Sequence, residues 1–188
     1  MHNSENIPTF ATYFIHSFQI GTFYAPLTEY YSLTSMETLD ETDLQILRTL
    51  QKNAKLTTKE LADAVHLTAT PVFERLKKLE RQGFIKKYVA VLDADKLNLS
   101  LLVFCKVKLK QISHDIANAF TRKILRMPEV IECYNTSGNY DYLLKVRASD
   151  MKHYQEFILN KLGQIETLSS LESTFGMSEI KQEYAITI

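Results

Sequence analysis

The hydrophobic pattern of the chain changes its period near Leu99, and this change limits the fold to a helical part followed by a mixed part. Before Leu99, apolar residues recur at spacings of three and four, which is typical of amphipathic helices. After it, apolar and polar residues alternate in runs such as 101–110, separated by two helical stripes. We therefore predict two small domains, the first helical and the second α+β.

Three short helices are predicted before Gly83. Asp40 precedes a stripe of leucines that ends near Leu50, and its carboxylate is well placed to cap the first helix. Thr57 and Glu60 have the spacing of a capping box at the start of a second helix. The small apolar face of that helix is expected to contain Leu61, Ala64 and Val65.

The third helix has an apolar side and a basic side. It follows the tight turn VHLTA, where Thr68 or Thr70 can cap it and Pro71 is acceptable in the first turn. Gly83 suits the left-handed residue that ends a helix, and residues 84–93 alternate into a strand pair or wing. The residues expected to face the first two helices are Val72, Leu76 and Leu79.

Two capped helices, a tight turn, a basic helix and a basic β segment, in this order, predict a winged helix-turn-helix that binds double-stranded DNA. A basic helix taken alone is more often an ordinary solvated helix. The presence of all these elements in this order favours a helix that binds DNA. Thr68, Thr70 and Pro71 begin the recognition helix, and we expect Thr70 and Phe73 near base edges. Phosphate contacts are assigned to Arg75, Lys78, Arg81, Lys86 and Lys87, and to Lys59 of the second helix.

Charge and hydropathy limit the other classes of protein. All 22 Lys and Arg residues lie after Ser35, together with 20 of the 22 acids, so this part of the chain is only slightly basic. Such a balance argues against non-specific coating of a polyanion and leaves room for a local basic surface. No apolar run approaches the roughly 18 residues that cross a bilayer, so no membrane partner is expected.

The first 35 residues are rich in Phe and Tyr, contain no Lys or Arg, and lack the basic region and aliphatic core of a signal peptide. We hypothesise that Met36 is the natural start and that the preceding residues come from an upstream start codon. If they are native, they could form a partner-binding arm. An N-terminal peptide from before Met36 in the endogenous protein would contradict the first hypothesis.

The second part reads strand, helix, strand, strand, helix, strand, which predicts a ferredoxin-like sandwich with both helices on one face of an antiparallel sheet. The segments are 101–110, 113–127, 130–148 with a turn at 137–139, 149–162 and 168–188. The inner sides of the helices are expected to carry Ile116, Phe120, Ile124 and Met127, and Met151, Tyr154, Ile158 and Leu162. The other face of the sheet is then free to pair with a second copy of the chain.

No motif in the sequence indicates catalysis. The histidines, His2, His16, His66, His114 and His153, have no metal-ligand spacing, and we expect neither a metal nor a cofactor. Ser113 and Asp115 flank His114, but sequence neighbours at a helix start cannot form a triad, and one of them is more simply an N-cap. Cys105 and Cys133 are isolated within predicted strands and are expected to be reduced and structural. We therefore do not expect an enzyme.

The run 39–97, with the recognition segment TPVFERLKKLERQGFI, resembles the amino-terminal domain of the Lrp/AsnC family of transcriptional regulators. The resemblance continues to the carboxyl end and spans essentially everything after Met36. It implies a cytoplasmic, nucleoid-associated regulator of amino acid or nitrogen metabolism. It also implies homodimers that assemble further, commonly to octamers, and a small effector, typically an amino acid, bound between dimers.

The turn TSGNYDY resembles the glycine and aspartate motif that lies beside the effector pocket of this family. The resemblance assigns effector contacts to Thr136, Gly138, Asn139, Tyr140 and Asp141, and more weakly to Ser173 and Thr174. An amino acid needs a carboxylate for its ammonium and donors for its own carboxylate, and this set offers both. Alternatively, Gly138 and Asn139 only form the hairpin turn, and Asp141 only accepts backbone amides.

The predicted organisation is an extension over 1–35, a winged helix-turn-helix domain over 36–87, a linker strand over 88–98 and a ligand-binding, oligomerising domain over 99–188. Two other functions stay open. One is an architectural protein that wraps DNA without sensing a ligand, and the other is a metabolite-binding module with a vestigial DNA domain. A preference for particular DNA sequences would exclude the architectural protein. A salt-sensitive affinity for DNA would exclude the module with a vestigial DNA domain.

Overall fold

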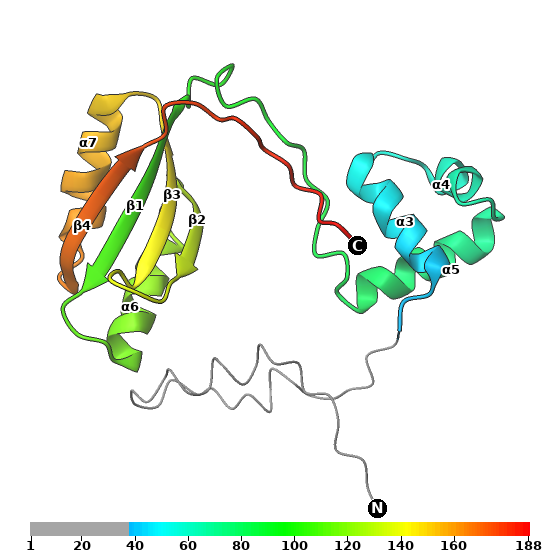
Figure 1. The fold of residues 1–188 in the computed structure, drawn as a ribbon, viewed down its shortest axis with the longest axis horizontal. Coiled ribbons are helices and arrows are strands. Elements are labelled where there is room, and N and C mark those ends of the chain that lie inside the picture. Colours follow the sequence, from blue (N-terminus) through cyan, green and yellow to red (C-terminus); the bar gives the residue numbers. More distant parts are fainter. Residues whose placement is uncertain (1–37) are drawn as a thin grey trace, which may run out of the picture. The chain divides into compact units, whose positions relative to one another are not determined.

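The computed structural model describes residues 38–188, so the predicted arm and the start at Met36 lie outside the described residues. Three helices come first (Figure 1): α3 over Glu41–Lys52, α4 over Thr58–Ala64 and α5 over Ala69–Arg81. None of the helices in this part of the chain is long and apolar enough to cross a membrane.

The first two helices begin at capping boxes; the sequence predicted the one at Thr57 and, at Asp40, the N-cap alone. Asp40 accepts the backbone N–H of Asp43 at 2.8 Å. Thr57 accepts the N–H of Glu60 at 3.2 Å, and the Glu60 carboxylate accepts the Thr57 N–H at 2.7 Å. Thr68 occupies the N-cap position of α5, but its side chain makes no capping hydrogen bond. The donors at the start of α5 therefore lack the side-chain cap that the other two helices have.

The three helices enclose one small core, made of Ile46, Leu50, Leu61, Ala62, Val65, Val72 and Leu79. The predicted apolar side of α5 is confirmed, with Leu76 partly buried beside Val72 and Leu79. On α4 the prediction of Ala64 is wrong, because Ala64 is exposed and Ala62 is buried in its place. An alanine stands on each flank of the Leu61 and Val65 stripe, so the spacing alone could not tell which flank packs against the core.

Gly83 ends α5 with φ of +78°, which an L side chain adopts only with strain, and the N–H of Phe84 bonds to the Leu79 carbonyl at 3.1 Å. No strand forms between residues 82 and 100, so the predicted wing and linker strand are not present as strands. Val89 and Val91 point into solvent. A strand needs a partner for its N–H and C=O groups, and among residues 38–188 no backbone hydrogen bond joins 86–93 to another segment.

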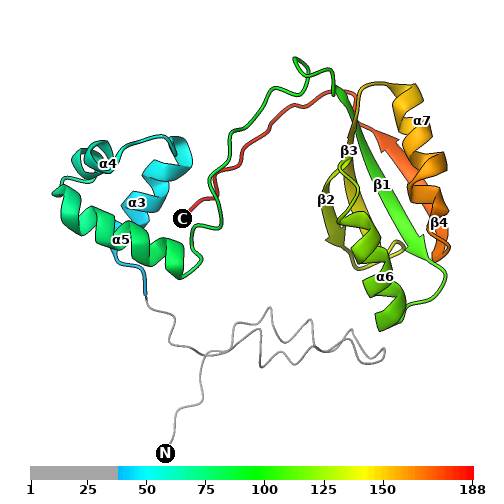
Figure 2. The same ribbon diagram turned by 180° about the vertical axis from the view of Figure 1, so that it is seen from behind.

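The second domain is a four-stranded antiparallel sheet with two helices, in the predicted ferredoxin-like order (Figure 2). Its elements are β1 Leu101–Leu109, α6 His114–Ile124, β2 Val130–Asn135, β3 Tyr142–Ala148, α7 Met151–Asn160 and β4 Leu168–Phe175, with a 3-10 turn at Leu162–Gln164 before β4. The strands lie in the order β2-β3-β1-β4. In the centre, Cys105 pairs with Leu144 of β3 and with Ser173 of β4.

One face of the sheet carries both helices. Alternate residues of β1 and β3, such as Val103 and Leu144, are buried against Phe120 of α6 and Phe157 of α7. The predicted stripe of α6 is confirmed, and Ser113 caps this helix through the N–H of Ile116. On α7 the prediction of Met151 is wrong, because this first residue of the helix is 55% exposed. Phe157 completes the stripe with Tyr154 and Ile158.

The segment after Phe175 is a tail, although the sequence predicted strand up to residue 188. The side-chain amide of Gln51 in α3 bonds to the backbone of Ile186 in the tail: its Oε1 accepts the Ile186 N–H at 2.6 Å, and its Nε2 donates to the Ile186 carbonyl at 3.1 Å. Arg48 donates to the carbonyl of Ile188 at 2.8 Å. The tail is therefore tied by its backbone to side chains of α3, without a sheet ladder.

Candidate nucleic-acid interface and effector site

The start of α5 presents the residues that were predicted to meet DNA bases. Thr68, Thr70 and Pro71 are exposed in the first turn, and Phe73 is 44% exposed on the same helix. The ammonium of Lys77 lies 5.7 Å from the centre of the Phe73 ring and 3.3 Å from the Glu80 carboxylate. A cation at this distance attracts the ring face, so Lys77 favours this orientation of Phe73 on the surface.

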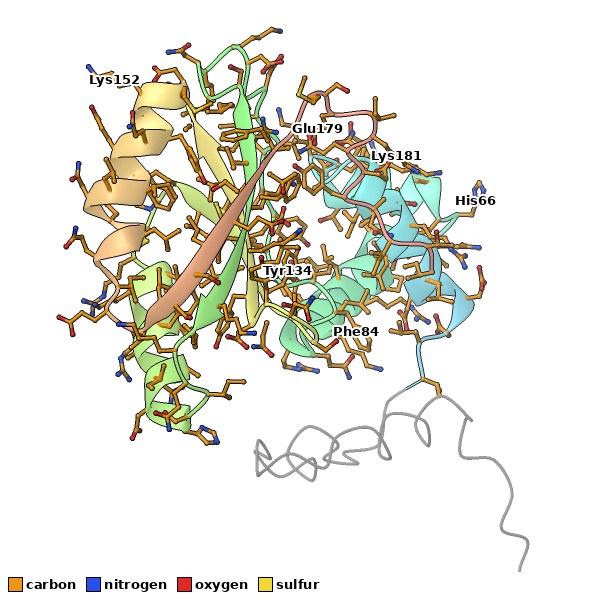
Figure 3. The ribbon with its side chains drawn as sticks, turned by 60° about the vertical axis from the view of Figure 1, so that its left-hand side comes forward. His66, Phe84, Tyr134, Lys152, Glu179 and Lys181 are labelled. Carbon is orange, nitrogen blue, oxygen red and sulfur yellow. The ribbon has the colours of Figure 1, made fainter. Side chains whose placement is uncertain are left out.

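The turn before α5 is tight because His66 takes the left-handed conformation, with φ of +56°. The N–H of Leu67 then bonds to the Ala62 carbonyl at 3.0 Å, which closes the end of α4. The side chain of His66 extends away from the helices (Figure 3). This exposure excludes packing of His66 in the core, and we predict a phosphate contact for it instead.

The predicted phosphate contacts fall into two groups. Lys59, Arg81, Lys86 and Lys87 have exposed side chains, and Lys78 is partly exposed. Arg75 differs, because its guanidinium donates to Asp40 at 2.6 Å and to Asp43 at 2.7 Å. Arg75 therefore joins α5 to the start of α3.

The pKa values of this ion-pair cluster follow from its hydrogen bonds. The hydrogen bonds to Asp43 and Asp40 raise the pKa of Arg75. The pKa of Asp40 is lowered by the backbone N–H of Asp43 and by Arg75. The helical pattern could not reveal this cluster, because Arg75 lies 32 and 35 residues from its partners along the chain.

The loop between β2 and β3 holds the predicted effector residues in a closed turn. The hydroxyl of Thr136 donates to the carbonyl of Tyr140 at 2.8 Å, and its N–H bonds to the carbonyl of Asp141 at 2.9 Å. Gly138 has φ of +127°, which favours glycine at this position. The turn is thus fixed by bonds within itself.

Asp141 connects this turn to the neighbouring strand. One carboxylate oxygen accepts the N–H of Leu109 at 2.7 Å, and the N–H of Asp141 bonds to the Val107 carbonyl at 2.9 Å. This is the structural role that was open as the alternative for Asp141. It does not exclude an effector contact, because the carboxylate has a second oxygen and further lone pairs.

Tyr140 belongs to a charged cluster that the sequence did not reveal. Its hydroxyl donates to Glu172 of β4 at 2.7 Å, and Lys106 of β1 donates to the other oxygen of Glu172 at 2.6 Å. The pKa of Glu172 is lowered by Lys106 first and by Tyr140 second. Alternating positions in β1 and β4 bring these side chains together, and only the strand register reveals it.

The structure separates the two predicted residues of β4. Ser173 faces the core, where its hydroxyl lies 2.6 Å from the hydroxyl of Tyr154, which in turn lies 3.0 Å from Cys105 Sγ. Thr174 lies two residues after Glu172 and so shares its outward face, beside Phe104 in the register. Thr174 therefore lies on the same face as Glu172 and Tyr140, and Ser173 does not.

The outward face of the sheet is a mixed surface that no described helix covers. Leu143 and Phe104 are partly buried on it, and Tyr134 of β2 is 53% exposed (Figure 3). Lys145 and Glu132 form an ion pair of 3.0 Å across β3 and β2. Apolar groups beside paired charges suit a surface that contacts another protein.

Comparison with known proteins matches both domains. Residues 39–86 match the family described as "Winged helix-turn-helix DNA-binding", and residues 102–186 match the "Lrp/AsnC ligand binding domain". The DNA-binding transcriptional activator DecR of Escherichia coli (strain K12) is 37% identical over 150 residues, which cover 80% of this chain and 99% of the relative. The Leucine-responsive regulatory protein of the same organism is also 37% identical, over 80% of this chain and 92% of its own.

Solved structures agree with these relatives. The transcriptional regulator NMB0573 of Neisseria meningitidis, in complex with L-Met, has a TM-score of 0.76 and 35% identity, over 80% of this chain and 97% of its own. Both DNA-binding and ligand-binding domains are thus matched in order, and the named relatives are transcriptional regulators. The chain belongs to the Lrp/AsnC family of DNA-binding transcriptional regulators with a ligand-binding domain.

Proposed function

We propose that this regulator recognises specific DNA sequences and controls amino acid or nitrogen metabolism in response to a small effector, an amino acid. The observation that carries the proposal is the exposed first turn of α5, followed by exposed basic residues on a well-packed three-helix core. Exposed threonines and Phe73 offer contacts to base edges, and Lys59, Arg81, Lys86 and Lys87 offer contacts to phosphates.

The sheet supports the proposed assembly. Its outward face joins Leu143 and Phe104 to paired charges, which suits contact with a second copy of this chain. A dimer would place two α5 helices on successive half-sites, so the operator should be pseudo-palindromic. We propose that the dimers assemble further, to an octamer.

The effector is proposed to bind between dimers at the turn that carries Thr136, Gly138, Asn139, Tyr140 and Asp141, with Thr174 on the same face as Tyr140. Thr136 and Asp141 have partners within the chain, and the second carboxylate oxygen of Asp141 remains available for the ammonium of an amino acid. The relative in complex with L-Met and the leucine-responsive relative support an amino acid as the effector class.

The internal partners of Thr136 and Asp141 also favour a second candidate, a ligand-independent architectural protein that wraps DNA. Thermal unfolding of the full chain with each of the twenty amino acids separates the two. A ligand that binds only the folded state raises the melting temperature by mass action. A shift with one amino acid supports the sensor, and no shift with any of them supports the architectural protein.

A further inference from the structure

A cavity of about 600 Å³ lies between the segment after the helical domain, the start of β2 and the tail after β4. Its apolar wall includes Leu92, Leu97, Leu99 and Ile131. This volume is in the range of sites for small organic molecules. None of the residues predicted to bind the effector or DNA lines it.

Glu129 is the unusual residue of this cavity, because its side chain is only 9% exposed. One carboxylate oxygen, Oε1, accepts a hydrogen bond from the ammonium of Lys161 and lies 3.9 Å from His153 Nε2. The other oxygen, Oε2, is buried and has no hydrogen-bond donor among residues 38–188. A buried carboxylate oxygen without a donor is unfavourable, so a ligand that supplied one would gain binding free energy.

Glu129 is charged in this environment. Burial is the largest single influence and acts to raise the pKa of its carboxyl, but the hydrogen bond and charge of Lys161, a backbone N–H and His153 together outweigh it, so the pKa is lowered. At neutral pH the side chain is therefore an ionised carboxylate, and the unpaired Oε2 shares its negative charge. Its strongest partner would be a cationic N–H donor.

The cavity as a whole favours a cation. Four carboxylates line it, Asp93, Asp95, Glu129 and Glu179, together with a single guanidinium, that of Arg147. That guanidinium already bonds to Glu179 at 2.9 Å and to the carbonyl of Ser100 at 3.4 Å. Two lysines that do not line the cavity pair with carboxylates that do: Lys161 with Glu129, and Lys96 with Asp93. With the imidazole of His153 neutral, the four carboxylates are met by three cations, and the excess charge is negative.

We propose that this cavity binds a small aliphatic amine, whose ammonium donates to Oε2 of Glu129 and whose hydrocarbon chain packs on Leu92, Leu97 and Leu99. The site is distinct from the proposed effector turn and does not depend on it. A second ammonium, in a diamine, would lie within the same acidic lining, at Asp93 and Asp95. Because the wall joins the segment 92–99 to the sheet domain, a bound amine would also stabilise that connection.

Calorimetric titration of the full chain with pentylamine and with 1,5-diaminopentane tests the proposal, with 1-pentanol as the uncharged control. We expect one amine per chain and no binding of the alcohol. Tighter binding of the diamine supports a second ammonium site, and equal binding supports the single contact at Glu129. No saturable binding of either amine overturns the proposal.

Variants assign the contact. Glu129→Gln removes the charge at almost constant shape and should weaken amine binding at least tenfold. Lys161→Gln breaks the same ion pair but keeps the carboxylate, so amine binding should be retained or become tighter. Leu97→Arg adds bulk and like charge on a wall residue that is 54% exposed, so the chain should fold and lose amine binding. Unchanged binding by Glu129→Gln and Leu97→Arg overturns the proposal.

Discussion

At the scale of single residues, Arg75 combines a structural role with a position on the recognition helix. Its guanidinium bonds to Asp43, whose side chain is 7% exposed, so removal of the arginine leaves a nearly buried carboxylate without its partner. We expect Arg75→Ala to lower the free energy of unfolding by about 1–2 kcal/mol, since the pair is intermediate between exposed and buried ones.

Arg81→Ala is the matched control for Arg75, because Arg81 is exposed near the end of the same helix. We expect it to leave stability unchanged and to reduce the slope of log affinity against log salt by about 1, as loss of one phosphate contact does. Urea unfolding and DNA titration at several salt concentrations measure both effects. Equal stability of the two variants would contradict the structural role of Arg75.

Asp40 gives the first helix a dependence on pH. Its pKa is lowered by the N–H of Asp43 and by Arg75, so the folded state binds a proton at Asp40 less readily than the unfolded chain. Asp40 therefore contributes to the stability of the folded state above its ordinary pKa of 3.8, and this contribution is lost as the pH falls below that value. Asp40→Asn retains a capping side chain, and its unfolding curves should show a smaller loss between about pH 4 and pH 2. An unchanged acid profile would contradict a lowered pKa of Asp40 in the folded state.

Asp141 can be tested for its two roles by two substitutions. Asp141→Asn keeps an oxygen for the N–H of Leu109, so stability should be nearly retained, whereas Asp141→Ala should cost about 1–2 kcal/mol. If the carboxylate also holds the ammonium of an amino acid, both variants lose effector binding. An effector response by Asp141→Asn equal to that of the wild type would leave Asp141 with its structural role alone.

At the scale of elements, two adjacent residues of α5 have different roles: Val72 packs in the core, and Phe73 is exposed for recognition of DNA. Val72 is fully buried, and its replacement by alanine should cost about 2 kcal/mol. Phe73→Ala should change stability by less than about 0.5 kcal/mol, as exposed substitutions do, yet change the preferred DNA sequence. Urea unfolding measures the stability of both variants, and selection from a random DNA pool measures their preferred DNA sequence. A large loss of stability in Phe73→Ala would assign Phe73 to the core.

The sequence predicted those elements whose signals are local. The N-cap at Asp40, the capping box at Thr57 and the left-handed end at Gly83 depend on residues close in the chain, and the structure confirms them. The strands predicted for residues 84–93 and after Phe175 are not formed, because alternation shows that a segment can be a strand but not that a partner is present. The Arg75 cluster and the contact of Lys106 with Glu172 were missed, since both join residues distant in sequence.

At the scale of the whole molecule, the outward face of the sheet is expected to hold two chains together. Leu143 lies partly buried on this face, so Leu143→Lys should shift the protein toward monomer by placing a charge in the contact. Leu125, which is 79% exposed after α6, gives the control Leu125→Lys, which should keep the assembly. Sedimentation equilibrium measures the mass. An unchanged mass of Leu143→Lys would place the contact elsewhere.

The central claim is that one chain both reads a DNA sequence and senses an amino acid. Selection of bound DNA from a random pool by the full chain, with and without a mixture of amino acids, tests it most directly. We predict enrichment of a pseudo-palindrome with half-sites about one helical turn apart, and a changed yield of this site when amino acids are present. A pool that shows no enriched sequence under either condition would contradict the claim and support a protein that binds DNA by its backbone alone.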